Sequence, residues 1–349
     1  QNDDEKDSDI FPLLDDPLFA FKIAARPEYS RTRYDGRLHD IKSHSEKLIT
    51  MPYSPLPHQI FVRNFLSPET PFKSLMLYHG LGSGKTESAI GVCEQGRQYY
   101  LQRGIHHKII VVASTNVRKN FRKQLFDIDK MEPARAPNGK NMPLNRDTSA
   151  LGWQMPGRVG DNLIREVVPN RGRGTSRNQI RIAIEKLIHS HYIFWGYIQF
   201  ANKLTELMTK HTDKQTGKLN EAQWKAELNS KFNGTTLVID EVHNLRMATE
   251  NGPDEIDDSD LPQSELKRKK DGKEKRDNMR RIRELVTETD NMRLLLLTAT
   301  PMYNKFSEII WPLNLLALND GRSTIQLSDV FTQSGEFIEP NGKEIFQKH

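Results

Sequence analysis

The chain of 349 residues contains 36% hydrophobic residues, enough for a buried core, and carries a formal net charge of +5. No apolar run approaches the ~18–20 residues that span a bilayer, so neither a membrane anchor nor a membrane partner is expected. The single cysteine, Cys93, excludes an internal disulfide and favours a reducing compartment, the cytoplasm or alternatively the nucleus. The positive charge favours a polyanionic partner only slightly, because a large domain can carry five charges without one.

The first 50 residues differ from the rest of the chain. An acidic start is followed by two apolar clusters, at residues 11–14 and 17–21. We interpret residues 1–50 as an N-terminal extension that docks onto the following domain through these clusters.

Five apolar runs then alternate with helical patterns over residues 51–318. The runs are Ser74–Tyr78, Lys108–Ala113, His191–Trp195, Thr236–Ile239 and Arg293–Leu297. The main helical patterns are Thr86–Leu101, Val117–Asp127, Gln179–His189 and Asp277–Glu288. Continuous apolar runs, rather than alternating ones, are typical of parallel strands that are covered on both faces. With the alternation of strands and helices, they predict an α/β fold with a doubly wound parallel sheet and helices on both faces.

Two stretches interrupt this alternation. Residues 131–178 are rich in Pro, Gly, Asn and Arg, and residues 250–276 place an acidic run before a basic one. The first has little periodicity and the second is dominated by opposite charges. Both are therefore predicted to be surface insertions that are partly disordered.

The apolar run at Ser74–Tyr78 leads into His79–Thr86, and a helical pattern follows. This is the setting of a phosphate-binding loop, in which glycines let backbone N–H groups surround an anion and the helix N-terminus adds positive charge. Lys85 would reach the β- and γ-phosphates of a nucleotide, and Thr86 would ligate Mg²⁺. The usual signature has glycine where this chain has His79, and a chance Gly-rich turn is the alternative interpretation. The predicted loop residues are Gly80, Gly82, Ser83, Gly84, Lys85 and Thr86.

The run at Thr236–Ile239 continues into an acidic motif, Asp240-Glu241-Val242-His243. An acidic residue at the tip of a buried parallel strand can lie beside a phosphate loop, because ligands gather at the carboxyl ends of such strands. Asp240 would hold Mg²⁺, and Glu241 would orient and deprotonate the attacking water. An acidic turn that opens a helix is the alternative, and the phosphate loop upstream argues against it. The predicted catalytic residues are therefore Lys85, Asp240, Glu241 and His243.

A third motif, Leu296–Pro301, ends the last apolar run with two threonines. The hydroxyls of Thr298 and Thr300 can hydrogen-bond His243 or the Mg²⁺ ligands, and so would couple the nucleotide to a bound strand. A Thr-capped turn before Pro301 describes the same backbone and does not compete with this role.

In their order, these motifs resemble the first RecA-like domain of superfamily 2 helicases and translocases, over roughly residues 51–318. The resemblance implies ATP and Mg²⁺ as cofactors and DNA or RNA as a partner. Tyr53–Gln59 is similar to the glutamine motif of that family, in which Gln59 would read the adenine. Val111–Asn116 is similar to the motif that contacts the nucleic-acid backbone, here through Ser114, Thr115 and Asn116.

Finer details resemble the helicase-like ATPases of large nucleocytoplasmic DNA viruses, a group that includes the poxvirus-type early transcription factor small subunit and nucleoside triphosphatase I. These details lie in His79–Thr86, Ile239–Arg246 and Asn314–Arg322. The resemblance implies RNA polymerase or other transcription proteins as partners. It also implies a virion or a cytoplasmic virus factory as the location.

One family feature is not found in the sequence, namely the motif Gln-x-x-Gly-Arg-x-x-Arg. We therefore interpret residues 319–349 as the start of a linker toward a second RecA-like domain. That domain, or a partner, would supply the arginine finger that fast hydrolysis needs. The 349 residues alone are expected to hydrolyse ATP slowly.

The leading hypothesis is an ATP-driven motor subunit that moves along or remodels DNA or RNA, in viral transcription. The alternative is a non-motor ATP-binding scaffold of a transcription or packaging complex. A scaffold does not need Lys85, Thr86, Asp240 and Glu241 all to be intact, which argues against it. A GTPase is disfavoured because the guanine-reading motif Asn-Lys-x-Asp is not found.

Overall fold

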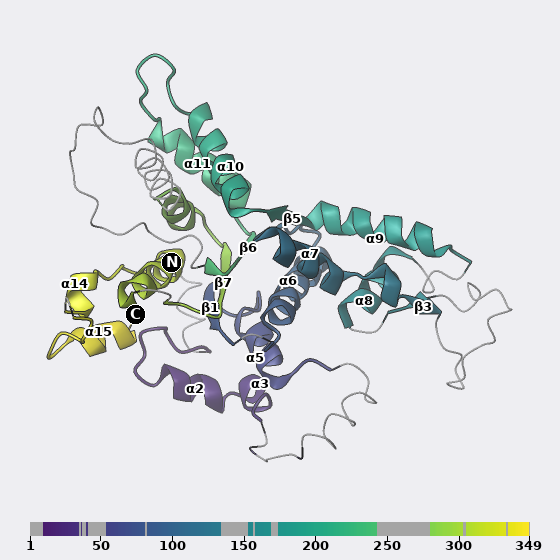
Figure 1. The fold of residues 1–349 in the computed structure, drawn as a ribbon, viewed down its shortest axis with the longest axis horizontal. Helices are drawn as coiled ribbons and strands as arrows, with labels where there is room; N and C mark the ends of the chain where they lie inside the picture. Colours follow the sequence, from purple (N-terminus) through teal and green to yellow (C-terminus); the bar gives the residue numbers. More distant parts are fainter. Residues whose placement is uncertain are drawn as a thin grey trace, which may run out of the picture.

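The computed structural model describes residues 10–34, 36, 40, 54–80, 82–133, 153–155, 158–168, 174–242, 280–302, 305–332 and 334–348. Its centre is a five-stranded sheet in the order β1-β7-β6-β2-β5, in which all neighbouring strands are parallel (Figure 1). The strands are β1 (Ser74–Tyr78), β2 (Ile109–Val112), β5 (Tyr192–Trp195), β6 (Thr236–Asp240) and β7 (Arg293–Thr298). Each coincides with one of the apolar runs of the sequence, because such runs exclude water from both faces of a strand.

Strand β7 lies between β1 and β6, although it is the last of the three in the chain. Tyr78 of β1 pairs with Thr298, and Asp240 of β6 pairs with Leu297. Since all the strands are parallel, their carboxyl ends lie at one edge of the sheet. This edge therefore carries the phosphate loop, the acidic motif and the threonine motif.

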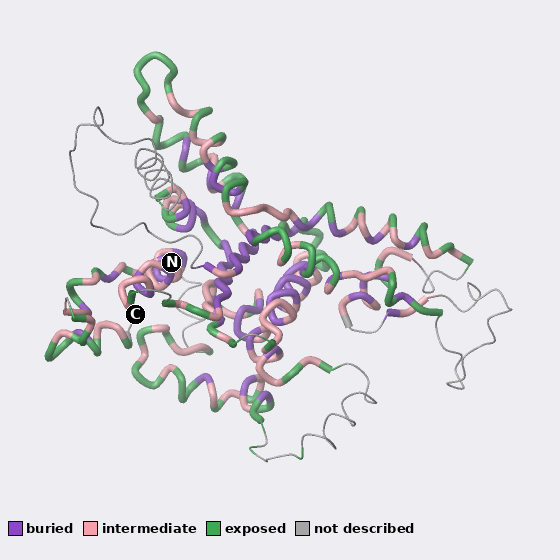
Figure 2. Tube along the Cα trace, in the orientation of Figure 1, coloured by how far each residue is buried: buried purple, intermediate pink, exposed green. Residues whose placement is uncertain are grey.

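The two faces of the sheet belong to two separate apolar cores. In β2, Ile109 and Val111 contribute to one core, whereas Ile110 and Val112 contribute to the other. The first core is completed by α5 (Pro57–Phe65), α6 (Lys85–Gln102), α7 (Thr115–Leu125), α8 (Arg158–Val167) and α9 (Arg177–His191). The second is completed by α10 (Tyr197–Lys210), α11 (Glu221–Phe232), a helix over 280–288 and α13 (Ile310–Asn319). Helices on both faces of a parallel sheet confirm the predicted α/β class, and Figure 2 shows the burial of the central strands.

Side-chain caps set the starts of two helices that the sequence places about two residues later. Helix α7 begins after Ser114, whose hydroxyl accepts a hydrogen bond from the Val117 N–H at 3.5 Å. Helix α9 begins after Ser176, which forms a reciprocal capping box with Gln179. These caps bond N–H groups that have no partner within the helix, so the helical period alone does not reveal the start.

The N-terminal extension packs on the first core through aromatic side chains. It contains α2 (Phe19–Ala25) and α3 (Pro27–Ser30). The rings of Phe11 and Phe19 meet Phe72 edge-on, with centroids 5.7 and 5.5 Å apart. Tyr29 is buried in the same core. The expected docking is therefore observed through Phe11, Leu14 and Phe19, whereas Leu13, Leu18 and Phe21 of the same clusters are exposed.

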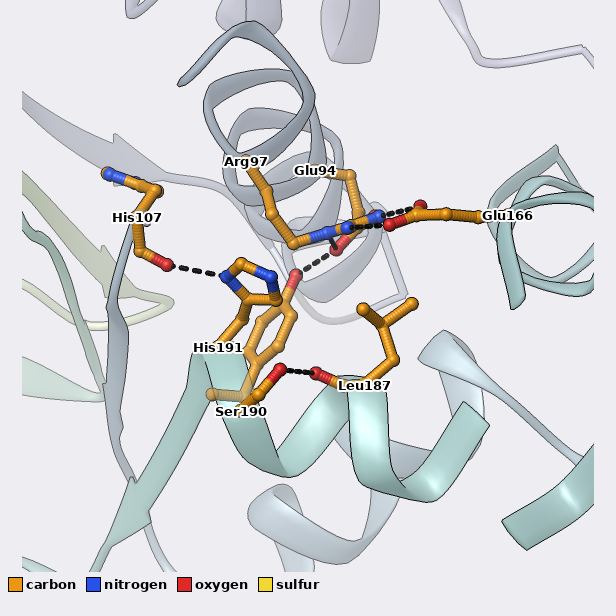
Figure 3. Close-up of polar contacts among 8 residues, drawn as sticks. Glu94, Arg97, His107, Glu166, Leu187, Ser190 and His191 are labelled. Carbon is orange, nitrogen blue, oxygen red and sulfur yellow. Dashed lines mark hydrogen bonds and ion pairs between the residues drawn. The ribbon is translucent and has the colours of Figure 1, made fainter. Parts of the chain in front are cut away.

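Helix α8 lies within the stretch that is predicted as a surface insertion, and it corrects that prediction for residues 158–168. Leu163 and Ile164 are fully buried in the first core. Arg97 of α6, itself buried, forms ion pairs with Glu94 and with Glu166 of α8 (Figure 3). The apolar stripe of α8 is visible in the sequence, but Pro- and Gly-rich flanks obscure it. The strands β3 (Glu132–Pro133) and β4 (Trp153–Gln154) form a separate small sheet nearby in the chain.

A third, smaller apolar cluster follows the sheet. Ile310, Ile325 and Val330 are buried in it. It is built from η6 (Phe306–Ile309), α13, α14 (Leu327–Val330) and α15 (Gly342–Lys348). The described residues of 319–349 thus pack into this cluster, whereas a linker between domains needs no apolar core of its own. Among the described residues, no helix combines the length and the apolar composition that a membrane crossing requires.

Candidate active site

The loop between β1 and α6 has the backbone of an anion cradle. Gly82 and Gly84 both have φ of 79°, in the left-handed region that glycine adopts without strain. Lys85 is the first residue of α6, and its ammonium donates to the carbonyl of His79 at 2.9 Å. The first N–H groups of a helix have no partner within it, and they point along the positive end of the helix dipole. Backbone and lysine together therefore suit a phosphate group.

Gln59 lies directly against this loop. It is buried in α5, and its Oε1 accepts from the backbone N–H of Leu56 at 2.9 Å. A Cβ placed on Gly84 would overlap the side-chain amide nitrogen of Gln59. Gly84 is therefore required twice, for its backbone angle and for this close approach. The structure places the predicted adenine-reading residue beside the predicted phosphate loop.

His58 makes a second contact with the loop that the sequence does not reveal. Its Nε2 lies 2.9 Å from the carbonyl of Ser83, and its Nδ1 lies 2.7 Å from the hydroxyl of Tyr34. A carbonyl can only accept, so in neutral His58 the Nε2–H donates to Ser83 and Nδ1 accepts from Tyr34. The N-terminal extension thus braces the phosphate loop through one histidine. His58 lies within the motif Tyr53–Gln59, but that motif assigns a role only to Gln59.

The end of β6 presents two acidic residues in different environments. Asp240 is buried, and burial followed by the charge of Glu241 raises its pKa to about 6, although Lys85 acts in the opposite direction. Glu241 has φ of 46°, which is uncommon for a residue other than glycine. Strained backbone of this kind is found preferentially at functional sites.

The Glu241 carboxylate, at the end of β6, contacts both the start of α6 and the end of β7. One oxygen lies 3.7 Å from the Lys85 ammonium. The other accepts from the Ala299 N–H at 3.4 Å and from the Thr298 hydroxyl at 3.5 Å. Thr298 is fully buried, and its Oγ1 accepts from the Thr300 N–H at 3.0 Å. The structure thus brings together the predicted residues of the phosphate loop, the acidic motif and the threonine motif.

Other predicted residues lie apart from this cluster or outside the described residues. Ser114, Thr115 and Asn116 are exposed at the carboxyl end of β2, which is separated from β1 by β6 and β7. The Thr115 hydroxyl accepts from the Arg118 guanidinium at 3.1 Å. His243 falls outside the described residues.

The oxygen donors at this edge fit a hard cation. Thr86 supplies a hydroxyl in the first turn of α6, and Asp240 supplies a buried carboxylate. Mg²⁺ is usually held by one or two carboxylates together with substrate phosphates and water. Within the described residues, no group of three or more His, Cys, Asp or Glu side chains could hold a metal ion by itself. A cation here would therefore need the phosphates of a bound nucleotide.

No protein-family model matches the chain. It is 24% identical over 264 residues to the "Putative ATP-dependent RNA helicase R563" of Acanthamoeba polyphaga mimivirus, which covers 76% of this chain and 32% of that protein. It is 25% identical over 285 residues to the "Putative helicase 009L" of Frog virus 3, covering 81% and 22% respectively. It is 23% identical over 266 residues to the "Putative helicase 087L" of Invertebrate iridescent virus 3, covering 74% and 20%. The chain is homologous to these helicases of large DNA viruses.

This relationship confirms the superfamily 2 helicase resemblance and its viral branch. The narrower resemblance to the poxvirus-type transcription factor and nucleoside triphosphatase stays a prediction. The chain spans between 20% and 32% of the lengths of these three relatives. Their names therefore describe proteins of which this chain matches one part.

Asp240→Asn is expected to stabilise the fold at pH 8 in Mg²⁺-free buffer. A carboxyl with a pKa of about 6 in the fold and 3.8 in the unfolded chain destabilises the fold when ionised, by up to ~3 kcal/mol. The penalty diminishes as pH falls through 6 and disappears below 3.8. Denaturant unfolding should show the variant more stable by about 2–3 kcal/mol at pH 8 and by roughly half of that at pH 5.

Asp213→Asn is the matched control. Hydrogen bonds from the backbone and side chain of Thr216 lower the pKa of this exposed carboxyl, so losing its charge should bring no gain at pH 8. An Asp240→Asn protein that is no more stable than the parent at pH 8 contradicts the assignment of Asp240 as a buried acid with a raised pKa.

Proposed function

We propose that this chain is the nucleotide-binding part of an ATP-driven nucleic-acid motor. The observation that carries the proposal is the Glu241 carboxylate, which lies between the Lys85 ammonium and the end of β7. A single acidic group thus contacts both the candidate phosphate loop and the threonine motif. The three relatives described above, all named as helicases and one of them as an RNA helicase, support the same class of function.

Each site residue has one role in this proposal. Lys85 and the backbone of residues 82–86 bind the phosphates, while Gln59 faces the base. Thr86 and Asp240 hold Mg²⁺, which when bound neutralises charge on the phosphates. Glu241 orients a water molecule and accepts its proton, as a carboxylate near the γ-phosphate can do.

The nucleic acid is proposed to bind at the carboxyl end of β2. The exposed turn of Ser114, Thr115 and Asn116 offers hydroxyl and amide groups at the start of α7. Exposed basic side chains follow on the same helix, at Lys119, Arg122 and Lys123. Such groups contact the phosphate backbone rather than the bases, so little sequence preference is expected.

The names of the relatives favour RNA as the first polymer to test, and their viral origin is compatible with a role in transcription. We further propose that a second RecA-like domain or a partner supplies the arginine finger. Such fingers contribute about 10³–10⁵ in rate in other phosphoryl-transfer enzymes.

The proposal is tested by the ATPase rate of the full chain with Mg²⁺, measured with and without RNA, single-stranded DNA and duplex DNA. Stimulation by at least one polymer is expected when the second domain or partner is supplied. Binding of Mg-ATP without any hydrolysis under all these conditions would instead favour the scaffold function.

Nucleic-acid binding is expected to weaken steeply as salt rises, because counterions are released when lysine and arginine neutralise phosphates. Lys119→Ala should reduce the slope of log affinity against log salt by about 1 for RNA of any sequence. Lys231→Ala, at an exposed site on α11, should leave the slope unchanged. Fluorescence anisotropy across a salt series measures both, and a salt-independent affinity contradicts backbone recognition.

A further inference from the structure

Tyr197 contacts the strand end that carries both acidic site residues. It is the first residue of α10 and is separated from β5 only by Gly196, and its ring packs against the second core. Its hydroxyl donates to the backbone carbonyl of Asp240 at 2.7 Å. Strand β2 lies between β5 and β6, so the phenol reaches past the end of β2 to make this bond. Sequence motifs gave this tyrosine no role, because the bond joins residues 43 apart.

The bonded carbonyl belongs to the peptide that joins Asp240 to Glu241. The φ angle of Glu241 describes rotation about the bond between that peptide and its own Cα. At 46° this angle is unfavourable for a side chain with a Cβ, so the peptide has a reason to rotate away. A hydrogen bond to its carbonyl opposes that rotation.

The direction of the Glu241 side chain depends on this peptide. With the peptide as it stands, one carboxylate oxygen lies 3.7 Å from the Lys85 ammonium and the other 3.4 Å from the Ala299 N–H. A rotated peptide would carry the carboxylate away from both. Misplacing a reacting group by about 1 Å can lower a rate about 10²-fold.

We propose that Tyr197 is a positioning residue for Glu241: its hydroxyl holds the peptide between Asp240 and Glu241 so that the carboxylate faces the phosphate loop. The inference rests on the proposed function, since it requires Glu241 to act on water during ATP hydrolysis. The alternative is a purely structural role, in which the bond stabilises the end of β6 and has no effect on hydrolysis.

The test uses single-turnover hydrolysis of labelled ATP by the full chain, with protein in excess, together with calorimetric binding of Mg-ATP. Tyr197→Phe should lower the hydrolysis rate about 10–100-fold while the dissociation constant changes by no more than about twofold. Tyr100→Phe is the matched control, because its hydroxyl accepts a hydrogen bond from Arg293 at 3.1 Å, away from the site residues. That variant should hydrolyse ATP at close to the parent rate.

A double-mutant cycle separates positioning from stability. When Glu241→Gln is already present, adding Tyr197→Phe should cost little further rate, because a base that is missing cannot be misplaced. If the two losses instead multiply, or if Tyr197→Phe alone hydrolyses ATP like the parent, the positioning role is overturned. Unfolding of Tyr197→Phe at temperatures where Tyr100→Phe is stable assigns the hydroxyl to structure and overturns it too.

Failure of this inference is distinguishable from failure of the proposed function. Hydrolysis that is lost in Glu241→Gln but retained in Tyr197→Phe removes only the positioning role. Hydrolysis that survives Glu241→Gln removes the assignment of the base, and the role of Tyr197 with it.

Discussion

Glu241→Gln is expected to stop ATP turnover while Mg-ATP binding stays close to that of the parent. The amide has nearly the shape of the carboxylate, and its oxygen can still accept from the Ala299 N–H, which lies 3.4 Å from the Glu241 carboxylate. It cannot accept a proton from water, and general-base catalysis contributes about 10²–10⁴-fold in rate. The loss of negative charge 3.7 Å from the Lys85 ammonium leaves that cation free to bind phosphate. Single-turnover hydrolysis and calorimetric binding measure the two effects separately.

Glu221→Gln provides the control for this variant. Glu221 is exposed in the first turn of α11, and its replacement changes the net charge by the same amount away from the site. It should leave hydrolysis and binding unchanged. A Glu241→Gln protein that hydrolyses ATP at the parent rate shows that another group takes the proton.

Lys85→Ala is expected to weaken Mg-ATP binding strongly and to leave the fold intact. Hydrogen bonds to charged groups contribute about 1.5–3 kcal/mol, so losing the ammonium should weaken binding ~10–100-fold. The fold should tolerate the change, because the Lys85 ammonium contacts the His79 carbonyl and the Glu241 carboxylate rather than an apolar core. Calorimetric titration with Mg-ATP gives the affinity, and circular dichroism reports the fold.

Two comparisons make this result specific. Lys231→Ala removes an exposed lysine of α11 and should bind Mg-ATP like the parent. Titration with Mg-ADP should show a smaller loss for Lys85→Ala, because the γ-phosphate contact is missing in both proteins. Unchanged Mg-ATP affinity in folded Lys85→Ala protein would refute the phosphate-loop assignment.

The elements of the sheet were readable in the sequence because each strand is a short apolar run bounded by polar residues. Lys85 and Asp240 were readable for a related reason, since each directly follows such a run or its glycine loop. Helix α8 was missed, although its apolar stripe is present, because its flanks are rich in proline and glycine. The composition of the flanks outweighed the helical period of a segment of only 10 residues.

The strand order and the long-range contacts came only from the tertiary structure. That β7 separates β1 from β6 depends on pairing between residues far apart in the chain, and no local pattern encodes it. The bonds of Tyr197 to Asp240 and of His58 to Ser83 have the same origin. The sequence by itself determined which side chains could bind a nucleoside triphosphate and activate water, because that chemistry is a property of residue types at strand ends. Only the folded sheet decided that Glu241 contacts Lys85 and Ala299, because parallel pairing brings those strand ends to one edge.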